Sequence, residues 1–179
     1  MPPKITHEQI VDYWASHVSE CELGIDWSEA EERCWRCGYK SKLQICHIIP
    51  DSLNGKYEPE NLVLLCGRCH REAPNFNDSR FMWFWLKGTH ASFYDMYWTI
   101  RGVHEFELMF GRRPFEGIET GGYNEDNLKE LVQEEINNAT IHFGEGRLNP
   151  STIACIFAKV EEKITGKEVL INLKLIFPI

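Results

Sequence analysis

Two cysteine pairs are the strongest chemical signal in the chain. Cys34 and Cys37 form one Cys-x-x-Cys pair, Cys66 and Cys69 form the other, and 28 residues lie between the pairs. Each pair can place two thiolates on one side of an ion, and two such pairs complete the tetrahedral coordination of zinc with no open position. We therefore predict one structural zinc ion per chain. The alternative is four reduced, buried cysteines without a metal.

Two histidines and an asparagine accompany these cysteines. His47 is followed by Ile-Ile-Pro, Asn61 precedes a leucine-rich stretch, and His70 comes directly after the last cysteine of the second pair. Imidazole has an unperturbed pKa of about 6.5, so a histidine can take a proton from water at neutral pH. One group of residues is thus suited to hold the fold together, and the other is suited to chemistry.

The order of these residues resembles that of the HNH endonucleases of the His-Me finger (ββα-metal) superfamily. The resemblance covers about residues 34–75 and rests on the whole set of cysteine pairs, His-Ile-Ile-Pro, Asn-Leu and Cys-His. It implies that His47 is the general base, that Asn61 braces the backbone near this base, and that His70 ligates a divalent catalytic ion, Mg²⁺ or Mn²⁺. It also implies an α+β fold, a ββα-metal finger with structural zinc, embedded here in a mainly helical surround.

Cys46 departs from the pattern, because many members of the family have Asp, Glu or His before the base, as a further ligand of the catalytic ion. Cysteine is a soft ligand and a poor partner for Mg²⁺. In one alternative the ion is held by His70 and the substrate phosphate, helped by Asp51 or a main-chain oxygen. In a second, Cys46 ligates a softer ion such as Mn²⁺, Ni²⁺ or Zn²⁺. In a third, the site no longer cuts.

The resemblance implies hydrolysis of DNA phosphodiester bonds, leaving 5′-phosphate and 3′-hydroxyl ends. Double-stranded DNA is the expected partner, in a bacterial or phage restriction or DNA-processing role, and a homodimer is left open. The rival hypothesis is a zinc-stabilised DNA-binding or interaction module with a degenerate site. The intact set of His47, Asn61 and His70 favours the enzyme, whereas Cys46 favours the module.

Local sequence signals predict the elements that position these residues. Residues 42–47 favour a short strand, 48–60 a loop rich in turn residues, and 62–65 a second strand that is apolar throughout and therefore buried. A helix is expected from about residue 67 to 73, because Pro74 stops it. Strand, loop, strand and helix make the ββα unit that the resemblance requires.

Helices are predicted on both sides of this finger. A capping box at Thr6 and Gln9 begins a helix over about 7–19, and Ser28 is expected to cap a short helix that runs into the first cysteine pair. Beyond the finger we predict helices over about 91–110, 125–142 and 150–165, then a closing strand over 169–177. The first of these carries a predicted stripe of Phe93, Tyr97, Ile100, His104 and Leu108.

Aromatic residues are dense between positions 81 and 98. They favour a large aromatic core that packs the finger against the C-terminal helices; the alternative is that some rings stack on exposed bases. The predicted organisation is therefore N-terminal helices over 1–33, the finger over 34–75, and an aromatic-rich helical part over 76–179 that packs on the finger.

The charge distribution is compatible with a nucleic-acid partner, although the net charge is −8. Residues 33–87 contain nine Lys and Arg against five Asp and Glu, so the finger is locally basic. We expect Lys42, Arg68 and Arg71 to contact phosphates, because binding depends on the local field. The sequence shows no membrane span or secretory signal, so a cytoplasmic location is expected.

Overall fold

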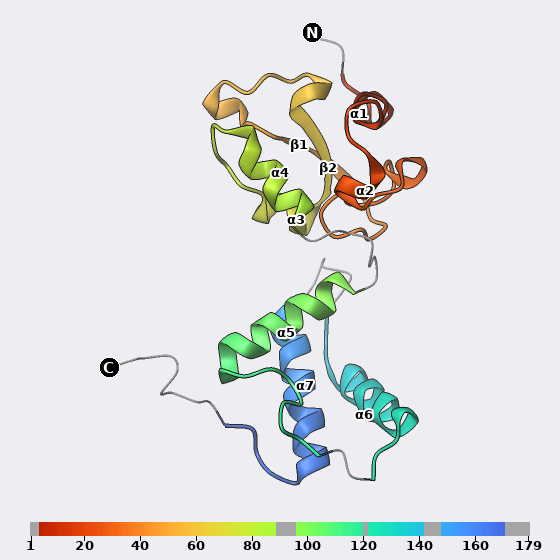
Figure 1. Cartoon of the computed structure of the whole chain (residues 1–179), viewed down its shortest axis with the longest axis vertical. Coiled ribbons are helices and arrows are strands. Elements are labelled where there is room, and N and C mark those ends of the chain that lie inside the picture. The colour runs from red at the N-terminus through yellow and green to blue at the C-terminus, as the bar shows by residue number, and fades with distance from the viewer. Residues whose placement is uncertain (1–3, 89–95, 120–121, 142–147, 171–179) are drawn as a thin grey trace, which may run out of the picture. The chain divides into compact units, whose positions relative to one another are not determined.

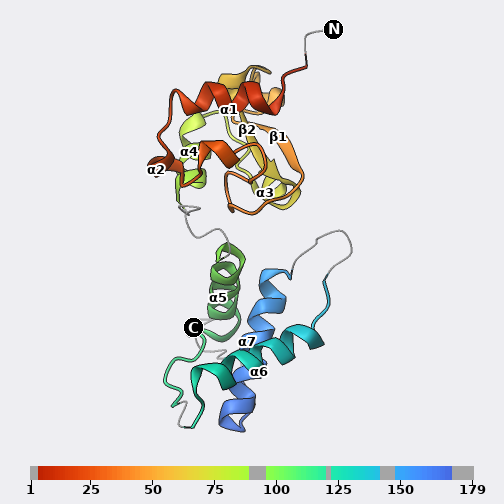
Figure 2. The same ribbon diagram turned by 90° about the vertical axis from the view of Figure 1, so that its right-hand side faces the viewer.

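The structure, a computed structural model, describes residues 4–88, 96–119, 122–141 and 148–170. The chain divides into two compact units, Met1–Tyr97 and Trp98–Ile179. Figures 1 and 2 show the elements of each unit. In the described part of the chain, no helix combines the length and the hydrophobicity needed to cross a bilayer.

Unit 1 contains a two-stranded antiparallel sheet surrounded by short helices. Its elements are α1 (His7–Ala15), α2 (Glu20–Leu23), β1 (Leu43–His47), β2 (Leu62–Cys66), α3 (Gly67–Glu72) and α4 (Ser79–Lys87). Both predicted strands and the predicted helix after them are therefore confirmed. All five residues of β2 are buried, which agrees with a strand that is apolar on both faces.

The register of the two strands shows which residues lie at each end of the hairpin. Leu43 pairs with Cys66 at one end of the hairpin, and His47 pairs with Leu62 at the other. Because an antiparallel pair runs in opposite directions, the end of β1 lies beside the start of β2. The cysteine of β2 and the histidine of β1 are thus held at opposite ends of the same hairpin.

Helix α1 packs against β2 and is anchored by a buried hydrogen bond. The predicted capping box is present, with Thr6 accepting from the backbone N–H of Gln9. Trp14 Nε1 donates to the carbonyl oxygen of Leu62 over 2.7 Å. The helix ends at Ala15, earlier than predicted, and the hydroxyl of Ser16 donates to the carbonyl of Tyr13 over 2.8 Å. Such local hydroxyl bonds compete with continuation of a helix.

The helix predicted from Ser28 is wrong. The structure has a 3₁₀ helix over Trp27–Glu29, with Asp26 as its N-cap. The hydroxyl of Ser28 donates to Asp26 Oδ1 over 2.6 Å, so this side chain is occupied with the preceding residues. The chain instead forms α2, which the sequence prediction missed and which begins at the Ser19–Glu22 capping box.

Helix α4 divides its aromatic residues between core and surface. Met82 and Leu86 are buried, whereas Phe81 and Phe84 are exposed. Trp85 packs under the guanidinium of Arg36, whose carbon lies 4.6 Å from the ring centroid. The aromatic residues of α4 are therefore not all buried in a core. Helix α4 belongs to unit 1, which also contains the finger.

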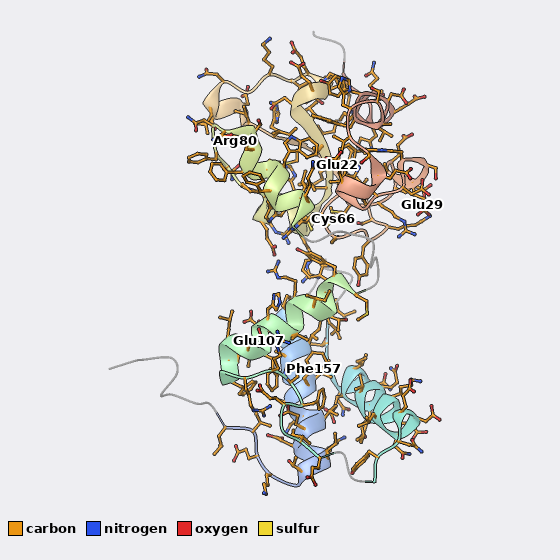
Figure 3. All side chains as sticks on the ribbon, in the orientation of Figure 1. Glu22, Glu29, Cys66, Arg80, Glu107 and Phe157 are labelled. Carbon is orange, nitrogen blue, oxygen red and sulfur yellow. The ribbon has the colours of Figure 1, made fainter. Side chains whose placement is uncertain are left out.

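Unit 2 contains α5 (Tyr97–Phe110), α6 (Glu125–Asn138) and α7 (Pro150–Thr165). Its core joins α5 to α7 through Phe106, Phe110, Ala154 and Ala158; Phe157, which packs against this core, is labelled in Figure 3. Gly102 allows the close approach of these helices, because an added Cβ would lie 2.3 Å from Ile153 Cγ2.

Among the described residues of the predicted stripe on α5, Tyr97 alone is buried. Ile100 and Leu108 are 44% and 73% exposed, whereas Trp98 and Phe106 are buried. Helical spacing identifies a stripe but not which of two apolar stripes faces a core. Phe93 and residues 171–177 of the predicted closing strand lie outside the described residues. The packing of residues 76–179 as one part on the finger stays a prediction.

A buried carboxylate connects α7 to the chain after α5. Glu161 is fully buried, accepts a 2.9 Å hydrogen bond from Arg112 Nη1, and forms a second bond with Nη2 of the same guanidinium. It also accepts from the backbone N–H of Phe115 over 2.5 Å. These bonds compensate the burial of the charge, since an unpaired carboxylate would be very costly there.

Candidate active site and metal centre

The four predicted zinc ligands converge at one end of the finger. Cys34 and Cys37 lie in a turn before β1, and the backbone N–H of Trp35 between them donates to Leu64 of β2 over 3.0 Å. Cys66 ends β2 and Cys69 lies one turn into α3, at the junction that Figure 3 labels by Cys66. The two pairs are therefore brought together by the pairing of the turn with the second strand.

The geometry of the four sulfur atoms fits a tetrahedral zinc ion. All four thiols are buried, and their Sγ atoms lie within 4.8 Å of one another. Cys37 Sγ and Cys66 Sγ are 3.9 Å apart, and zinc–sulfur bonds of about 2.3 Å give tetrahedral sulfur atoms about 3.8 Å apart. Among the described residues this is the one group of three or more His, Cys, Asp or Glu arranged for a metal. The predicted cysteine cluster is confirmed.

Without a cation, the crowded thiols cannot all ionise. Hydrogen bonds from the other cysteines, that of Cys34 foremost, lower the pKa of Cys66. The pKa of Cys37 and that of Cys69 are raised instead, and hydrogen bonding with Cys34 is the largest cause in both. Because a zinc ion binds thiolates, its charge would supply the compensation that this buried cluster lacks.

His47 lies at the opposite end of the hairpin from the cysteines. It is the last residue of β1 and half-buried. Its ring lies beside that of Tyr57, with centroids 5.7 Å apart and planes at 50°. Tyr57 was not predicted as a site residue, because its position in a loop carries no signal that would place it against the histidine.

Asn61 holds the loop that follows His47. Its Oδ1 accepts from the N–H of Ile49 over 2.9 Å, and its Nδ2 donates to the carbonyls of Ile49 and Lys56 over 3.0 and 2.9 Å. The backbone carbonyl of Asn61 also accepts from the N–H of Ile48 over 2.8 Å. One amide thus joins the end of β1 to the far side of the loop, which is the arrangement a bracing residue needs.

His70 lies on α3 near His47, and its orientation leaves one ring nitrogen available. Its Nδ1 is 2.7 Å from Oε1 of Gln44. Since a carbonyl oxygen can only accept, Nδ1 carries the proton and Nε2 keeps its lone pair. Burial, and secondly the charge of His47, lower the pKa of His70 and so favour its neutral form. Gln44 was missed at the sequence level, because only strand pairing brings it to α3.

Cys46, the residue before His47 in β1, is a buried thiol. It is 4% exposed, and its thiol donates to the carbonyl oxygen of His47 over 3.5 Å. Burial, and secondly the charge of Cys34, raise its pKa to about 12. The thiol is therefore neutral. Its role as a catalytic-ion ligand stays a prediction, and this environment does not favour it.

The three predicted phosphate-binding residues are not equivalent. Arg68 and Arg71 lie on α3 beside His70, the former half-buried and the latter exposed. Lys42 is exposed but precedes β1 at the cysteine end. With a rise of about 3.3 Å per residue, it is about 16 Å along the strand from His47. Contact of these residues with DNA stays a prediction.

Comparison with known protein families finds a match, which covers the finger. Residues 32–76 match the family model described as HNH endonuclease. No curated protein and no solved structure matches the chain. The matched segment contains the four cysteines, β1, β2 and α3, which together have the ββα-metal fold. Residues 32–76 are therefore similar to an HNH endonuclease domain, and within them four cysteines are placed to form a zinc site.

Proposed function

We propose that the protein is a metal-dependent endonuclease that hydrolyses DNA phosphodiester bonds. The observation that carries this proposal is that His47 on β1 and His70 on α3 lie near enough for the charge of His47 to lower the pKa of His70, within the segment that matches the HNH family. The zinc cluster lies at the other end of the same hairpin. Its function is to hold β2 and α3 together, and thereby to fix the position of the histidine that follows Cys69.

His47 is the general base of this proposal. Its neutral imidazole takes a proton from water, the water oxygen bonds to phosphorus, and the bond from phosphorus to the 3′ oxygen breaks. The departing 3′ oxygen takes a proton from solvent, so the products are a 5′-phosphate and a 3′-hydroxyl. Asn61 positions the base by holding the backbone at Ile49, and the ring of Tyr57 restricts the orientation of the imidazole.

His70 is the protein ligand proposed for the divalent ion, through Nε2. Bound Mg²⁺ or Mn²⁺, or in the alternative Ni²⁺ or Zn²⁺, would supply an electrophile for the phosphate and charge stabilisation for the leaving oxygen. Gln44 fits this role of His70, because it fixes the tautomer from the other ring nitrogen. Cys46 does not fit a hard ion, so the first of the three alternatives for the ion, His70 with the substrate phosphate, is the one we adopt.

The basic residues of α3 support DNA as the substrate. Arg68 and Arg71 directly flank the Cys69–His70 segment, on the same short helix. We propose double-stranded DNA as the partner, in restriction or DNA processing. Each substitution that removes a phosphate contact should reduce the salt dependence of binding by about one unit.

A second candidate function, a DNA-binding module that does not cut, is favoured by one observation. The position before the base holds a buried, neutral thiol in place of a hard ligand. In this candidate the zinc-stabilised finger binds DNA and the two histidines have no catalytic role.

A plasmid-cleavage assay separates the two candidates. Supercoiled plasmid is incubated with the zinc-loaded protein and Mg²⁺, Mn²⁺, Ni²⁺ or added Zn²⁺. We expect His47→Ala to reduce the rate by about 10²–10⁴-fold with zinc content intact. His104→Ala is the matched control, because His104 is exposed and lies in unit 2. Cleavage by His47→Ala at the wild-type rate would exclude the base assignment, and no cleavage with any ion would favour the module.

A further inference from the structure

A cavity of about 430 Å³ lies in unit 1 beside the loop that carries Asn61. Its walls come from α1, α4 and the segment between β1 and β2; the lining residues that matter here are Tyr13, Trp14, Lys56, Glu60, Asn61 and Trp83. Ligand pockets commonly measure from about 300 to about 1,000 Å³. The cavity is thus large enough for one nucleobase with its sugar.

One wall of the cavity is aromatic and held in place. Trp14 and Trp83 meet edge to face, with centroids 4.6 Å apart and planes at 65°, and Tyr13 meets Trp14 edge to face at 4.9 Å. The hydrogen bond from Trp14 to Leu62 ties this wall to β2. Trp83 is half-buried and therefore leaves part of its ring exposed. Aromatic surfaces of this kind stack on unpaired bases of a nucleic acid.

The other wall carries groups of both charges. The Lys56 side chain is 73% exposed and lies 3.7 Å from Glu58, which places a cation where a phosphate of the same strand could pass. Glu60 also lines the cavity. Its carboxylate can only accept hydrogen bonds, so it favours a base edge that presents N–H donors.

The cavity shares its wall with the candidate active site. Asn61 lines the cavity and bonds Ile49, two residues after His47, and Lys56. One loop thus joins His47 to the lining of the cavity, so a strand bound at His47 would run next to that lining.

We propose that this cavity binds one base that has left its pair in the double-stranded substrate, and that it prefers guanine. Guanine presents N1–H and N2–H side by side, which suits both oxygens of the Glu60 carboxylate. Thymine presents a single N–H between two carbonyls, which the carboxylate repels. Trp83 supplies the stacking surface, and Lys56 contacts the adjoining phosphate without regard to the base. This inference rests on the proposed function, since it deepens the substrate preference of the same site.

Binding is measured separately from cleavage. The zinc-loaded full chain carrying His47→Ala is titrated into fluorescent single-stranded oligothymidylates that contain one central guanine, adenine, cytosine or thymine, and affinity is read by anisotropy. We expect the guanine strand to bind about tenfold more tightly than the all-thymine strand. Glu60→Gln should remove this preference, Lys56→Met should weaken all four strands equally, and Trp83→Leu should weaken all four by about tenfold.

Glu58→Gln is the matched control. Glu58 lies two residues before Glu60 and contacts Lys56, so this variant removes the same charge from a neighbouring position. It should preserve the guanine preference. Equal affinity for the four strands, a preference that survives Glu60→Gln, or loss of the preference in Glu58→Gln would each overturn the proposal. If plasmid is cleaved by the wild type but binding shows no base preference, the cavity proposal fails and the nuclease stands. If the preference is found but nothing is cleaved, the base pocket stands and the nuclease fails.

Discussion

Gly55→Ala tests how the loop after His47 is built. An added Cβ would lie 1.7 Å from the carbonyl oxygen of Ile49, 2.6 Å from its carbonyl carbon and 2.9 Å from Nδ2 of Asn61. The first two contacts are with backbone, so relief requires the loop itself to move. Gly55 does not belong to the described glycines with positive φ, so the expected cost comes from the contact and not from the backbone dihedral.

The magnitude follows from the bonds that the movement would break. The side chain of Asn61 makes three hydrogen bonds, to the N–H and carbonyl of Ile49 and to the carbonyl of Lys56. At about 0.5–1.5 kcal/mol each, their loss predicts a decrease of about 2–4 kcal/mol in the free energy of unfolding of unit 1. A displacement of about 1 Å near a reacting group can cost about 10²-fold in rate, so cleavage should fall by a similar factor.

Urea unfolding of the zinc-loaded protein, followed by tryptophan fluorescence, measures the first effect. Five of the six tryptophans lie in residues 1–97, so the signal reports mainly on unit 1. Gly67→Ala is the matched control for stability, because its added Cβ would meet nothing closer than 3.6 Å. Asn61→Ala should cost about as much as Gly55→Ala, and the double variant should cost clearly less than their sum, since both break the same bonds. Additive costs, or a Gly55→Ala protein within about 0.5 kcal/mol of wild type, would refute the reasoning.

Three further predictions concern the metal centre, the position before the base, and acid stability. Elemental analysis of the dialysed protein should find one zinc per chain. Cys34→Ser should lose this zinc together with the fold of unit 1, because structural zinc contributes about 10–16 kcal/mol in zinc-finger peptides. Retention of stability without zinc would contradict this prediction. Cys46→Asp should destabilise unit 1 in urea unfolding, since it places a carboxylate at a buried position. Cys46→Ala should cost about 1 kcal/mol of unfolding free energy. A stable Cys46→Asp protein with raised Mg²⁺-dependent cleavage would show instead that the position faces the catalytic ion. A hydrogen bond from Lys163, 2.6 Å away, lowers the pKa of Glu135. The pair therefore contributes to stability above the ordinary pKa of 4.5, and this contribution is lost as pH falls through the lowered value. Lys163→Met should reduce the loss of unfolding free energy between neutral and acidic pH, and an unchanged pH dependence would exclude this pair as the cause.

The finger was predictable because its signals are local and its metal constraint is strict. Two Cys-x-x-Cys pairs can bind one ion only if the segments that carry them lie side by side. The apolar run 62–65 between turn residues is long enough for a strand but too short for a helix. The structure confirms both strands, α3 and the cysteine cluster. The roles of His47, Asn61 and His70 stay predictions that their geometry supports.

The predictions that failed depend on competition between neighbours. Asp26 and Ser19 formed the caps that Ser28 had been expected to supply, because several residues in one segment could cap equally well. On α5, the predicted stripe is exposed at Ile100 and Leu108, whereas the neighbouring stripe through Trp98 and Phe106 is buried, with Phe106 in the core that α5 shares with α7.

The sequence by itself determined which residues could carry chemistry: the four thiols, the two histidines and the asparagine, since their types and spacing suit a metal-tied ββα unit. The tertiary structure alone decided how each side chain is used. Strand pairing brought Gln44 to His70, burial made Cys46 a neutral thiol, and the packing of α1 and α4 created the cavity next to Asn61. These contacts join residues as far apart in the sequence as Trp14 and Trp83, and spacing along a chain carries no information about partners that only folding brings together.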